Sequence, residues 1–231
     1  MEDLSKEELY TVSYKTESLE TCIRQRHSVR EYLPKEVDQT IIEDCLRLAQ
    51  LAPSNSNIQN WRLLIASGAG RERIVKALMK EATTGDAPNI PPLPEKYRHF
   101  RSELGRELYG AGGYGIPRSD KEARDKAVLR NYEFFGAPVI AIIAQDPALA
   151  NIDSLSSGMW LQTFILALTE QGLGTCVEVS VAGYPEVLKR EFGTDLDILC
   201  GLAIGWPSDS KLNRLHTGRG KIEDNVKWVK E

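Results

Sequence analysis

The chain has 231 residues, of which 42% are hydrophobic and 27% are charged, and its net charge is -4. This length and composition are typical of one large globular domain, and the slightly acidic balance argues against a nucleic-acid partner. The first residues are acidic rather than basic and apolar, and no apolar run reaches the roughly 18 residues that span a bilayer, so we expect no export signal and no membrane partner.

The cysteines and histidines are too widely spread to form an obvious site. Cys22, Cys45, Cys176 and Cys200 show no close pairing, which favours reduced thiols and a cytoplasmic protein. The histidines lack the spacing of metal ligands, so we expect no metal site.

A compact cationic segment follows the first predicted helix. The apolar spacing over 16–26 predicts a helix that delivers Arg26-His27-Ser28-Val29-Arg30 at its C-terminal end. Two arginines that flank a hydroxyl offer both charge and a donor to an anion such as a phosphate. The alternative is a solvated basic helix end that pairs with Glu31 or Glu36, and the residues alone leave both readings open.

A polar loop begins where the second predicted helix ends. The apolar spacing predicts a helix over 38–51, which Pro53 terminates. The loop that follows, 52–61, is crowded with amide and hydroxyl groups that suit a planar polar ring, although a plain turn would explain the same residues. A short strand over 61–66 and a helix through Ile74 come next.

Residues 84–120 differ in composition from the rest of the chain. Prolines and glycines surround a short helical patch at 95–109. A segment this long without continuous regular structure is usually functional or disordered. Its aromatic residues favour a lid that packs over a ligand, whereas a proline-rich docking segment at 88–94 is the rival interpretation. The aromatic residues are Tyr97, Phe100, Tyr109 and Tyr114.

The second half of the chain predicts a buried sheet. The apolar runs 138–144 and 199–204 indicate central strands covered on both faces, and the helix predicted over 155–171 is apolar nearly all round. Such a helix fits between the sheet and a second subunit, which predicts a homodimer. The tail, 222–229, alternates like an edge strand or an arm laid on a partner. The order of elements favours an α+β (mixed α/β) fold with helices on both faces of one sheet.

The glycine pairs match no familiar nucleotide site. Segment 172–175 follows a helix instead of a strand and lacks the third glycine of the dinucleotide fingerprint, and 218–221 lacks the upstream glycine of a P-loop. No Gly-x-Ser-x-Gly nucleophile motif occurs either. Two glycines within 172–179 still let the main chain approach a flat ligand closely.

The combination of motifs resembles the FMN-dependent nitroreductase family, and most of all its nitrobenzoate-reductase branch. Arg26-His27-Ser28-Val29-Arg30 is similar to the family's opening Arg-x-Ser-x-Arg signature, and the 52–61 loop is similar to its Ala-Pro-Ser-x-x-Asn-x-Gln-Pro-Trp motif. Further similarity lies in 129–138, 172–176, 205–207, 213–215 and Arg219.

This resemblance implies one nitroreductase-like domain over 1–231. It implies a central mixed sheet, a lid or insertion at 84–120 and a C-terminal arm at 221–231. It also implies a homodimer with FMN at the interface, each site being built from both subunits.

By the same resemblance, the cationic segment binds FMN. Arg26, Ser28 and Arg219 would hold the phosphate, with His27 beside them, because guanidinium groups match phosphate geometry. Arg30 would lie near the pyrimidine edge of the flavin, where a fixed cation favours the reduced state.

The remaining cofactor contacts are expected from the loop and from the glycine-rich stretch. The other subunit would contribute Pro53, Ser54, Asn57 and Gln59. Backbone groups of Val177 and Glu178 would lie against the central ring of the flavin, and Arg130 would meet a substrate carboxylate or the flavin edge. Asn60 stands where the family usually has proline, which predicts a less rigid loop.

The implied function is an FMN-dependent oxidoreductase that takes electrons from NADH or NADPH and passes them to a nitroaromatic or quinone-like acceptor by a ping-pong mechanism. Catalysis is then centred on the flavin, and we assign no catalytic side chain. Two alternatives stay open. One is a specialised biosynthetic flavoenzyme (oxidase, dehydrogenase or dehalogenase), and the other is a flavin-binding regulatory or storage protein. The absence of a Glu-x-x-x-Tyr pair from 84–120 argues against a deiodinase.

Overall fold

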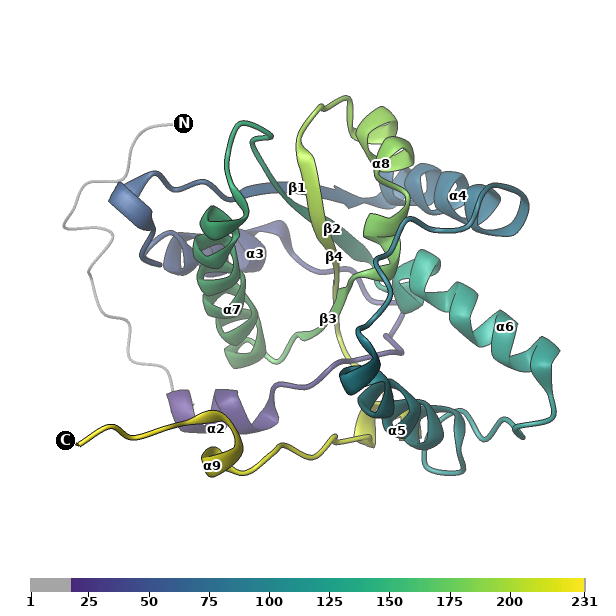
Figure 1. Cartoon of the computed structure of the whole chain (residues 1–231). Coiled ribbons are helices and arrows are strands. Elements are labelled where there is room, and N and C mark those ends of the chain that lie inside the picture. Colours follow the sequence, from purple (N-terminus) through teal and green to yellow (C-terminus); the bar gives the residue numbers. More distant parts are fainter. Residues whose placement is uncertain (1–17, 231) are drawn as a thin grey trace.

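The computed structural model describes residues 18–230 and contains one four-stranded sheet with helices on both faces (Figure 1). Its strands lie in the spatial order β1-β2-β4-β3, and all three neighbouring pairs are antiparallel. The strands are β1 (Arg62–Ser67), β2 (Val139–Gln145), β3 (Gly174–Glu178) and β4 (Asp197–Gly205).

The expectation of a mixed sheet is therefore corrected. Among the described residues, the parallel pairing is limited to an isolated bridge between Ser28 and Thr175, on the outer edge of β3. Apolar runs that are buried on both faces are typical of parallel strands. Here the same burial arises because helices cover both faces of an antiparallel sheet.

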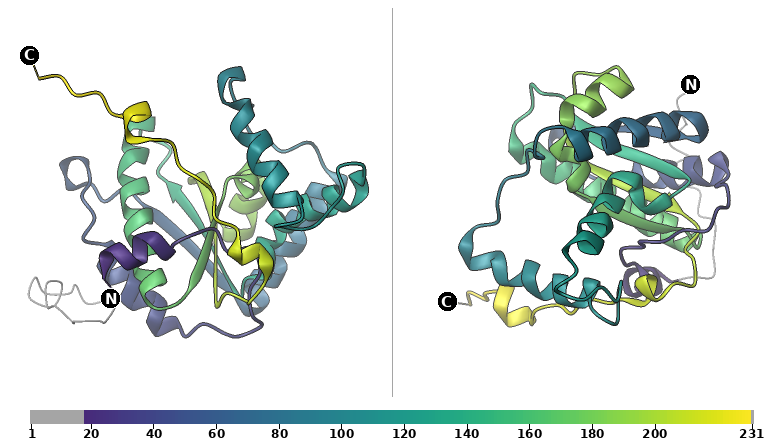
Figure 2. Two further views of the ribbon diagram at one scale, coloured as in Figure 1. Left: turned by 90° about the horizontal axis from the view of Figure 1, so that it is seen from below. Right: turned by 90° about the vertical axis from the view of Figure 1, so that its right-hand side faces the viewer.

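Strand β2 divides the core into two halves. Val139, Ala141 and Ile143 face a cluster shared with α3 (Gln39–Ala49) and α7 (Ser154–Glu170). Ile140 and Ile142 face the opposite cluster, which is shared with α4 (Gly68–Thr84) and α8 (Pro185–Phe192). Figure 2 shows the sheet between these helices. The predicted α+β fold with helices on both faces is confirmed.

The boundaries of the predicted helices agree with local capping chemistry. Helix α2 (Leu19–Gln25) begins after Ser18, whose hydroxyl accepts the Thr21 N–H at 3.1 Å. Helix α3 begins after Asp38, whose carboxylate accepts the Thr40 N–H at 2.9 Å. Side-chain acceptors at the N-cap satisfy donors that the first turn leaves free. The first positions of the helix predicted over 16–26 lie outside the described residues.

Three elements were not predicted as regular structure. Strand β3 was interpreted as a ligand-approaching loop, because its glycine obscures the strand signal. Helices α6 (Lys121–Leu129) and α8 escaped notice because they are short and mostly charged on their exposed sides. Proline at the first position of α8 is a helix-start signal that marks this element in the sequence.

The segment predicted as a lid forms α5 (Arg98–Tyr109), which projects from the sheet together with α6 (Figure 2). No residue of α5 is buried. Its stem is fixed to the body, because Asn89 N–H donates to the Gly183 carbonyl at 2.8 Å. That this segment closes over a substrate stays a prediction.

The C-terminal tail is not the strand that its alternation suggested. Residues Ile222–Asn225 form one helical turn, α9, in which Asp224 accepts the Lys221 N–H at 3.1 Å. Beyond it, Trp228 and Val229 are 79% and 78% exposed. The alternative prediction, an arm that lies on a partner, remains.

Candidate functional site

The cationic segment runs along the edge of the sheet. Val29 N–H donates to the Thr175 carbonyl of β3 at 2.9 Å. The Val29 side chain fills the space above Gly174, where an added Cβ would lie 2.6 Å from Val29 Cγ2. Gly174 therefore admits a core side chain of the cationic segment, and not a flat ligand as we had expected. Gly172 has a different role, since its positive φ of 78° ends helix α7.

Asn213 fixes the end of the same segment. Its side chain is only 8% exposed. It accepts the Arg30 N–H at 2.8 Å and donates to the carbonyls of Glu31 at 2.7 Å and Ser208 at 3.0 Å. The sequence motif around Asn213 had indicated a family resemblance but no role. The structure shows that this side chain positions Arg30.

The segment opens onto a cavity of about 560 Å³. The C-terminal segment covers one side, and Leu104 of α5 and Gln162 of α7 lie on the others. The cavity is lined by Ile23, Arg24, Arg26, His27, Ser28, Arg30, Leu104, Gln162, Leu215, His216, Thr217 and Arg219. Four of the predicted cofactor residues (Arg26, His27, Ser28 and Arg30) therefore meet Arg219 at one site.

The positive charge of this cavity is largely uncompensated. Arg24 pairs with Glu20 at 2.8 Å. Arg26, Arg30 and Arg219 form no ion pair with any carboxylate of residues 18–230. Arg219 donates only to oxygens of Thr217 and Gly218, at 2.7 to 2.9 Å. Among the described residues neither Glu31 nor Glu36 forms an ion pair with these arginines, and the arrangement fits a bound oxyanion. A solvated basic helix end stays the alternative.

His27 adds an unused polar atom to the cavity. Its Nδ1–H donates to the Gln25 carbonyl at 2.7 Å, whereas its Nε2 is buried without a hydrogen-bond partner. The ring lies 4.9 Å from the ring of His216. Since Nδ1 is used by the Gln25 carbonyl, Nε2 is the ring nitrogen left for a ligand of the cavity.

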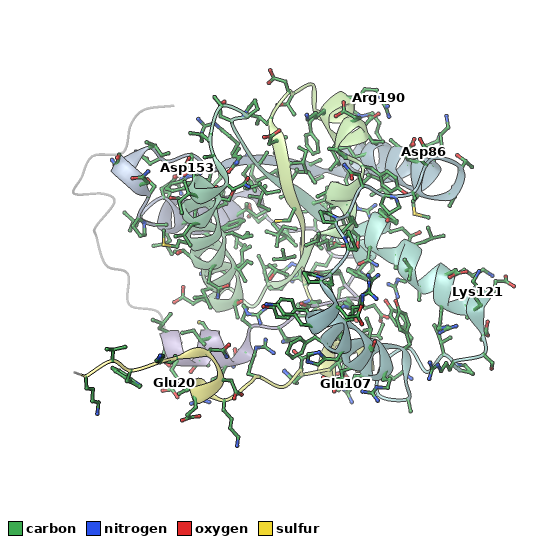
Figure 3. All side chains as sticks on the ribbon, viewed as in Figure 1. Glu20, Asp86, Glu107, Lys121, Asp153 and Arg190 are labelled. Atoms are coloured by element: carbon green, nitrogen blue, oxygen red, sulfur yellow. The ribbon has the colours of Figure 1, made fainter. Side chains whose placement is uncertain are left out.

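The 53–59 loop does not reach this cavity in the same chain. It lies against the first turn of α7, where Asn55 N–H donates to Ser156 Oγ at 3.3 Å. The cationic segment borders a cleft that includes Thr169, near the other end of α7. The rise of a helix places these two positions about 20 Å apart. Figure 3 labels Asp153, which directly precedes α7, and Glu20, which belongs to α2.

The side chain of Asn60 is anchored, which differs from the predicted less rigid loop. Its side chain is 2% exposed and donates to the Asp153 carbonyl at 2.8 Å and to Ser157 Oγ at 3.1 Å. In place of the proline ring, two hydrogen bonds attach the end of the loop to the start of α7.

The loop itself has an unusual backbone. Ser56, Asn57 and Gln59 have φ values of 50°, 57° and 47°. Residues other than glycine rarely adopt this left-handed region, and such conformations concentrate at binding sites. Ser54 supports the turn because its hydroxyl accepts the Gln59 N–H at 3.0 Å. Pro53, Asn57 and Gln59 are exposed and Ser54 is half-buried, and none of the four predicted loop residues lines the cavity.

Val177 and Glu178 end strand β3 and differ sharply in exposure. The Val177 side chain is 42% exposed, whereas Glu178 is 3% exposed and neither of its carboxylate oxygens has a hydrogen-bond partner. Burial raises the pKa of Glu178 well above its ordinary value, and only the nearby Arg30 charge opposes this. Burial therefore favours the neutral form of this carboxyl group.

Arg130, the predicted substrate residue, lies outside the cavity. It follows α6 and is half-buried, and its guanidinium carbon lies 6.0 Å from the centre of the Tyr114 ring. It belongs to the lid side of the molecule and not to the cationic segment.

Several cavity residues were missed from the sequence, namely Leu104, Gln162, His216 and Thr217. They come from three separate segments, and no local motif links them. Among residues 18–230, no three His, Cys, Asp or Glu side chains gather as metal ligands do. Within the same range, every helix is too short or too polar to cross a bilayer.

The chain is similar in sequence to known proteins over most of its length. The sequence model of the nitroreductase family matches residues 23–206. The chain is 32% identical to nitrobenzene nitroreductase from Ectopseudomonas oleovorans over 227 residues, which cover 92% of this chain and 97% of that protein. It is 30% identical to 4-nitrobenzoate reductase from Pseudomonas putida, with coverage of 84% and 88%.

Solved structures are similar over the same range. The FMN and NADPH-dependent nitroreductase NfnB from sphigopyxis sp. strain HMH has a TM-score of 0.87 and 28% identity, and the match covers 93% of this chain and 100% of that chain. The FMN-dependent nitroreductase NfnB from Mycobacterium smegmatis, in complex with NADPH, has a TM-score of 0.84 and 26% identity, with coverage of 91% and 97%.

Proposed function

The chain belongs to the nitroreductase family, and from this premise we propose that it is an FMN-dependent oxidoreductase that passes electrons from NADH or NADPH to nitroaromatic or quinone-like acceptors. The family model spans most of the chain, and the similar proteins include nitrobenzene and nitrobenzoate reductases. The observation that carries the proposal is the cavity in which Arg26, Arg30 and Arg219 converge without a carboxylate partner.

These residues fit FMN. A phosphate dianion would neutralise the arginines, and the unpartnered His27 Nε2 would gain a partner. We assign the phosphate to Arg26, Ser28 and Arg219, with His27 beside it. When it is bound, FMN supplies the redox chemistry, accepting hydride from NAD(P)H and delivering electrons to the acceptor.

The chain's own residues would orient the cofactor and set its electrostatics. Asn213 holds the Arg30 backbone, so that the Arg30 charge is fixed where the flavin is expected to gain negative charge. Burial raises the pKa of Glu178, and the neutral carboxyl that this favours would add no opposing charge. The exposed Val177 side chain presents an apolar surface beside the expected ring position. Donor and acceptor would then stack in turn on the open face of the flavin, as a ping-pong mechanism requires.

We further propose a homodimer in which the 53–59 loop of one subunit completes the site of the other. The lining of the cavity supports this arrangement, because it includes the cationic segment and Arg219 but no residue of the 53–59 loop of the same chain. The exposed apolar residues Leu155 and Met159 of α7 offer an interface. A cytoplasmic location and the absence of a nucleic-acid or membrane partner stay predictions from the sequence.

A spectroscopic experiment tests the function. The purified protein, reconstituted with FMN and made anaerobic, should lose its flavin absorbance when NADH or NADPH is added and regain it when nitrobenzene is added. Loss and recovery would support a reductase. If neither donor bleaches the flavin, the proposal fails and a flavin-binding protein without turnover is favoured. Bleaching without recovery by nitroaromatics or quinones would favour a specialised flavoenzyme.

A mutational experiment tests the phosphate assignment. Each charge-assisted hydrogen bond contributes about 1.5 to 3 kcal/mol, so Arg26→Ala combined with Arg219→Ala should weaken FMN binding by about 100-fold or more. The exposed Arg118, which has no ion pair among the described residues, provides the control Arg118→Ala. Titration of apoprotein with FMN gives the affinity, and unchanged affinity in the double variant would place the phosphate elsewhere.

A further inference from the structure

The tip of the lid is built around two stacked tyrosines. The rings of Tyr109, at the end of α5, and Tyr114 lie 5.9 Å apart with an interplanar angle of 22°. The turn between them is held by main-chain bonds, since Tyr114 N–H donates to the Leu108 carbonyl and Ile116 N–H to the Tyr109 carbonyl, both at 2.8 Å. The pair is therefore a fixed aromatic surface and not a loose loop.

Arginines from separate segments surround this surface. Burial raises the pKa of Tyr109, and the charges of Arg101, Arg30 and Arg124 act to lower it. Burial also raises the pKa of Tyr114, where Arg130 and Arg30 act in the same lowering sense. None of the charges that act on either phenol belongs to a carboxylate of residues 18–230. The surroundings of the two rings are therefore strongly cationic.

These charges lack compensation within the described chain. We name Arg101, Arg124 and Arg130 the lid arginines. None of them forms an ion pair with a carboxylate of residues 18–230, although Arg124 and Arg130 are half-buried. Arg124 Nε and Tyr114 Oη are both buried without a hydrogen-bond partner. Buried polar and charged groups without partners are costly, so their convergence indicates a ligand.

The position of the lid arginines relates them to the cofactor cavity. Arg30 lines that cavity and also acts on both lid tyrosines. Tyr114 also interacts electrostatically with Cys176 of β3, which places the lid surface on the side of this strand. An aromatic acceptor stacked on the flavin that is expected beside Val177 would therefore face the lid arginines.

We propose that the lid arginines, together with the Tyr109–Tyr114 surface, bind the carboxylate of an aromatic acceptor, so that this enzyme favours nitrobenzoate-like substrates over uncharged nitroarenes. The inference rests on the proposed function. Guanidinium groups bind carboxylates through paired, charge-assisted hydrogen bonds, and the phenol faces suit an aromatic ring. The 2′-phosphate of NADPH is a less suitable occupant, because it lies at the far end of that molecule from the reacting nicotinamide.

Binding of benzoate, which cannot be reduced, tests the site without turnover. Calorimetric titration of the FMN-loaded protein should show benzoate binding that weakens about 10-fold or more in Arg124→Gln and in Arg130→Gln, since a charge-assisted bond contributes about 1.5 to 3 kcal/mol. Arg124→Lys keeps the charge and should recover part of the affinity. Arg118→Gln, on the same lid but outside the cluster, should behave as the parent. Benzoate binding that is absent from the parent or unaffected by both variants would overturn the proposal.

Kinetics separate this inference from the proposed function. In Arg124→Gln, kcat/KM should fall about 10-fold or more for 4-nitrobenzoate, through KM, and by less than about threefold for nitrobenzene. Equal losses for both acceptors, or a loss seen with NADPH but not with NADH, would overturn it. If the parent reduces neither acceptor, the proposed function fails, whereas benzoate titration still decides whether the lid arginines bind a carboxylate.

Discussion

Asn60 illustrates how one buried amide replaces a rigid ring. Its two donated hydrogen bonds attach the loop to α7. Asn60→Ala should lower the free energy of unfolding by about 1 to 3 kcal/mol, because a buried carbonyl and a hydroxyl lose their donor. The exposed neighbour Asn55 serves as the control, and Asn55→Ala should change stability by less than about 0.5 kcal/mol. Urea unfolding checks both variants, and equal stabilities would contradict the anchoring role.

The burial of Glu178 leads us to expect that the stability of the protein depends on pH. Burial raises the pKa of Glu178 in the folded state above the ordinary value of 4.5. The contribution of Glu178 to the free energy of unfolding is therefore fully present below about pH 4.5, the pKa in the unfolded state. This contribution declines by about 1.4 kcal/mol for each pH unit as the pH rises from there to the folded-state pKa. Glu178→Gln keeps the shape and removes the titration.

The positive charge of Arg30 opposes the neutral form of Glu178. Three other groups interact with Glu178 but stay protonated, because burial raises the pKa of each; they are Tyr32, Cys176 and Cys200. Urea unfolding of FMN-loaded protein between about pH 5 and pH 8 should show a smaller decline for Glu178→Gln than for the parent. If the free energy of unfolding declines equally with pH in the parent and in Glu178→Gln, Glu178 is ionised in the folded protein.

At the scale of elements, the contact between the cationic segment and β3 depends on Gly174. An added methyl group would clash with Val29, and overpacking of this kind costs about 1 to 3 kcal/mol. Gly174→Ala should therefore destabilise the protein and weaken FMN binding, because Ser28 and Arg30 flank the displaced residue.

A second substitution makes this prediction specific. Val29→Ala, introduced together with Gly174→Ala, makes room for the methyl group and should restore part of the FMN affinity. Gly112→Ala is the control, since a Cβ there meets no atom within 4 Å. FMN titration and thermal unfolding measure both effects. If the double variant binds FMN no better than Gly174→Ala alone, the packing explanation fails.

The elements also show which sequence signals were sufficient. The apolar periodicity of α3 and α7 and the continuous runs of β2 and β4 depend on burial against one core, so the pattern alone identified them. The strand β3 was hidden because Gly174 is required by Val29, a residue distant in the sequence. The antiparallel order was equally invisible, because covering both faces of a sheet leaves the same apolar run in either orientation.

Some residues of the candidate site could be identified from the sequence, and others could not. Arg26, Ser28, Arg30 and Arg219 were identified because a local motif and a family resemblance mark them, and one cavity brings them together. Leu104, Gln162 and His216 were not, because only the tertiary structure relates them. The prediction of a less rigid loop at Asn60 does not include its two hydrogen bonds, because the partners, Asp153 and Ser157, are distant in the sequence.

At the scale of the whole molecule, the exposed side of α7 predicts the assembly. Leu155 is 64% exposed and Met159 is 37% exposed, on a helix whose other side is buried. Leu155→Glu should shift the protein toward monomer and weaken FMN binding, because a charge cannot enter an apolar interface without cost. Val128→Glu, at an exposed apolar position on α6, is the control. Sedimentation gives the mass, and a monomeric parent would contradict the dimer.

The length of α7 has a consequence for how defects combine. In the proposed dimer, each subunit gives its cationic segment to one FMN and its 53–59 loop to the other. When a subunit damaged at Arg26 and Arg219 joins one damaged at Ser54 and Asn57, both defects fall on the same site and the second site is whole. Two inactive proteins, once mixed and allowed to exchange subunits, would therefore form mixed dimers that each have up to half the activity of the parent dimer.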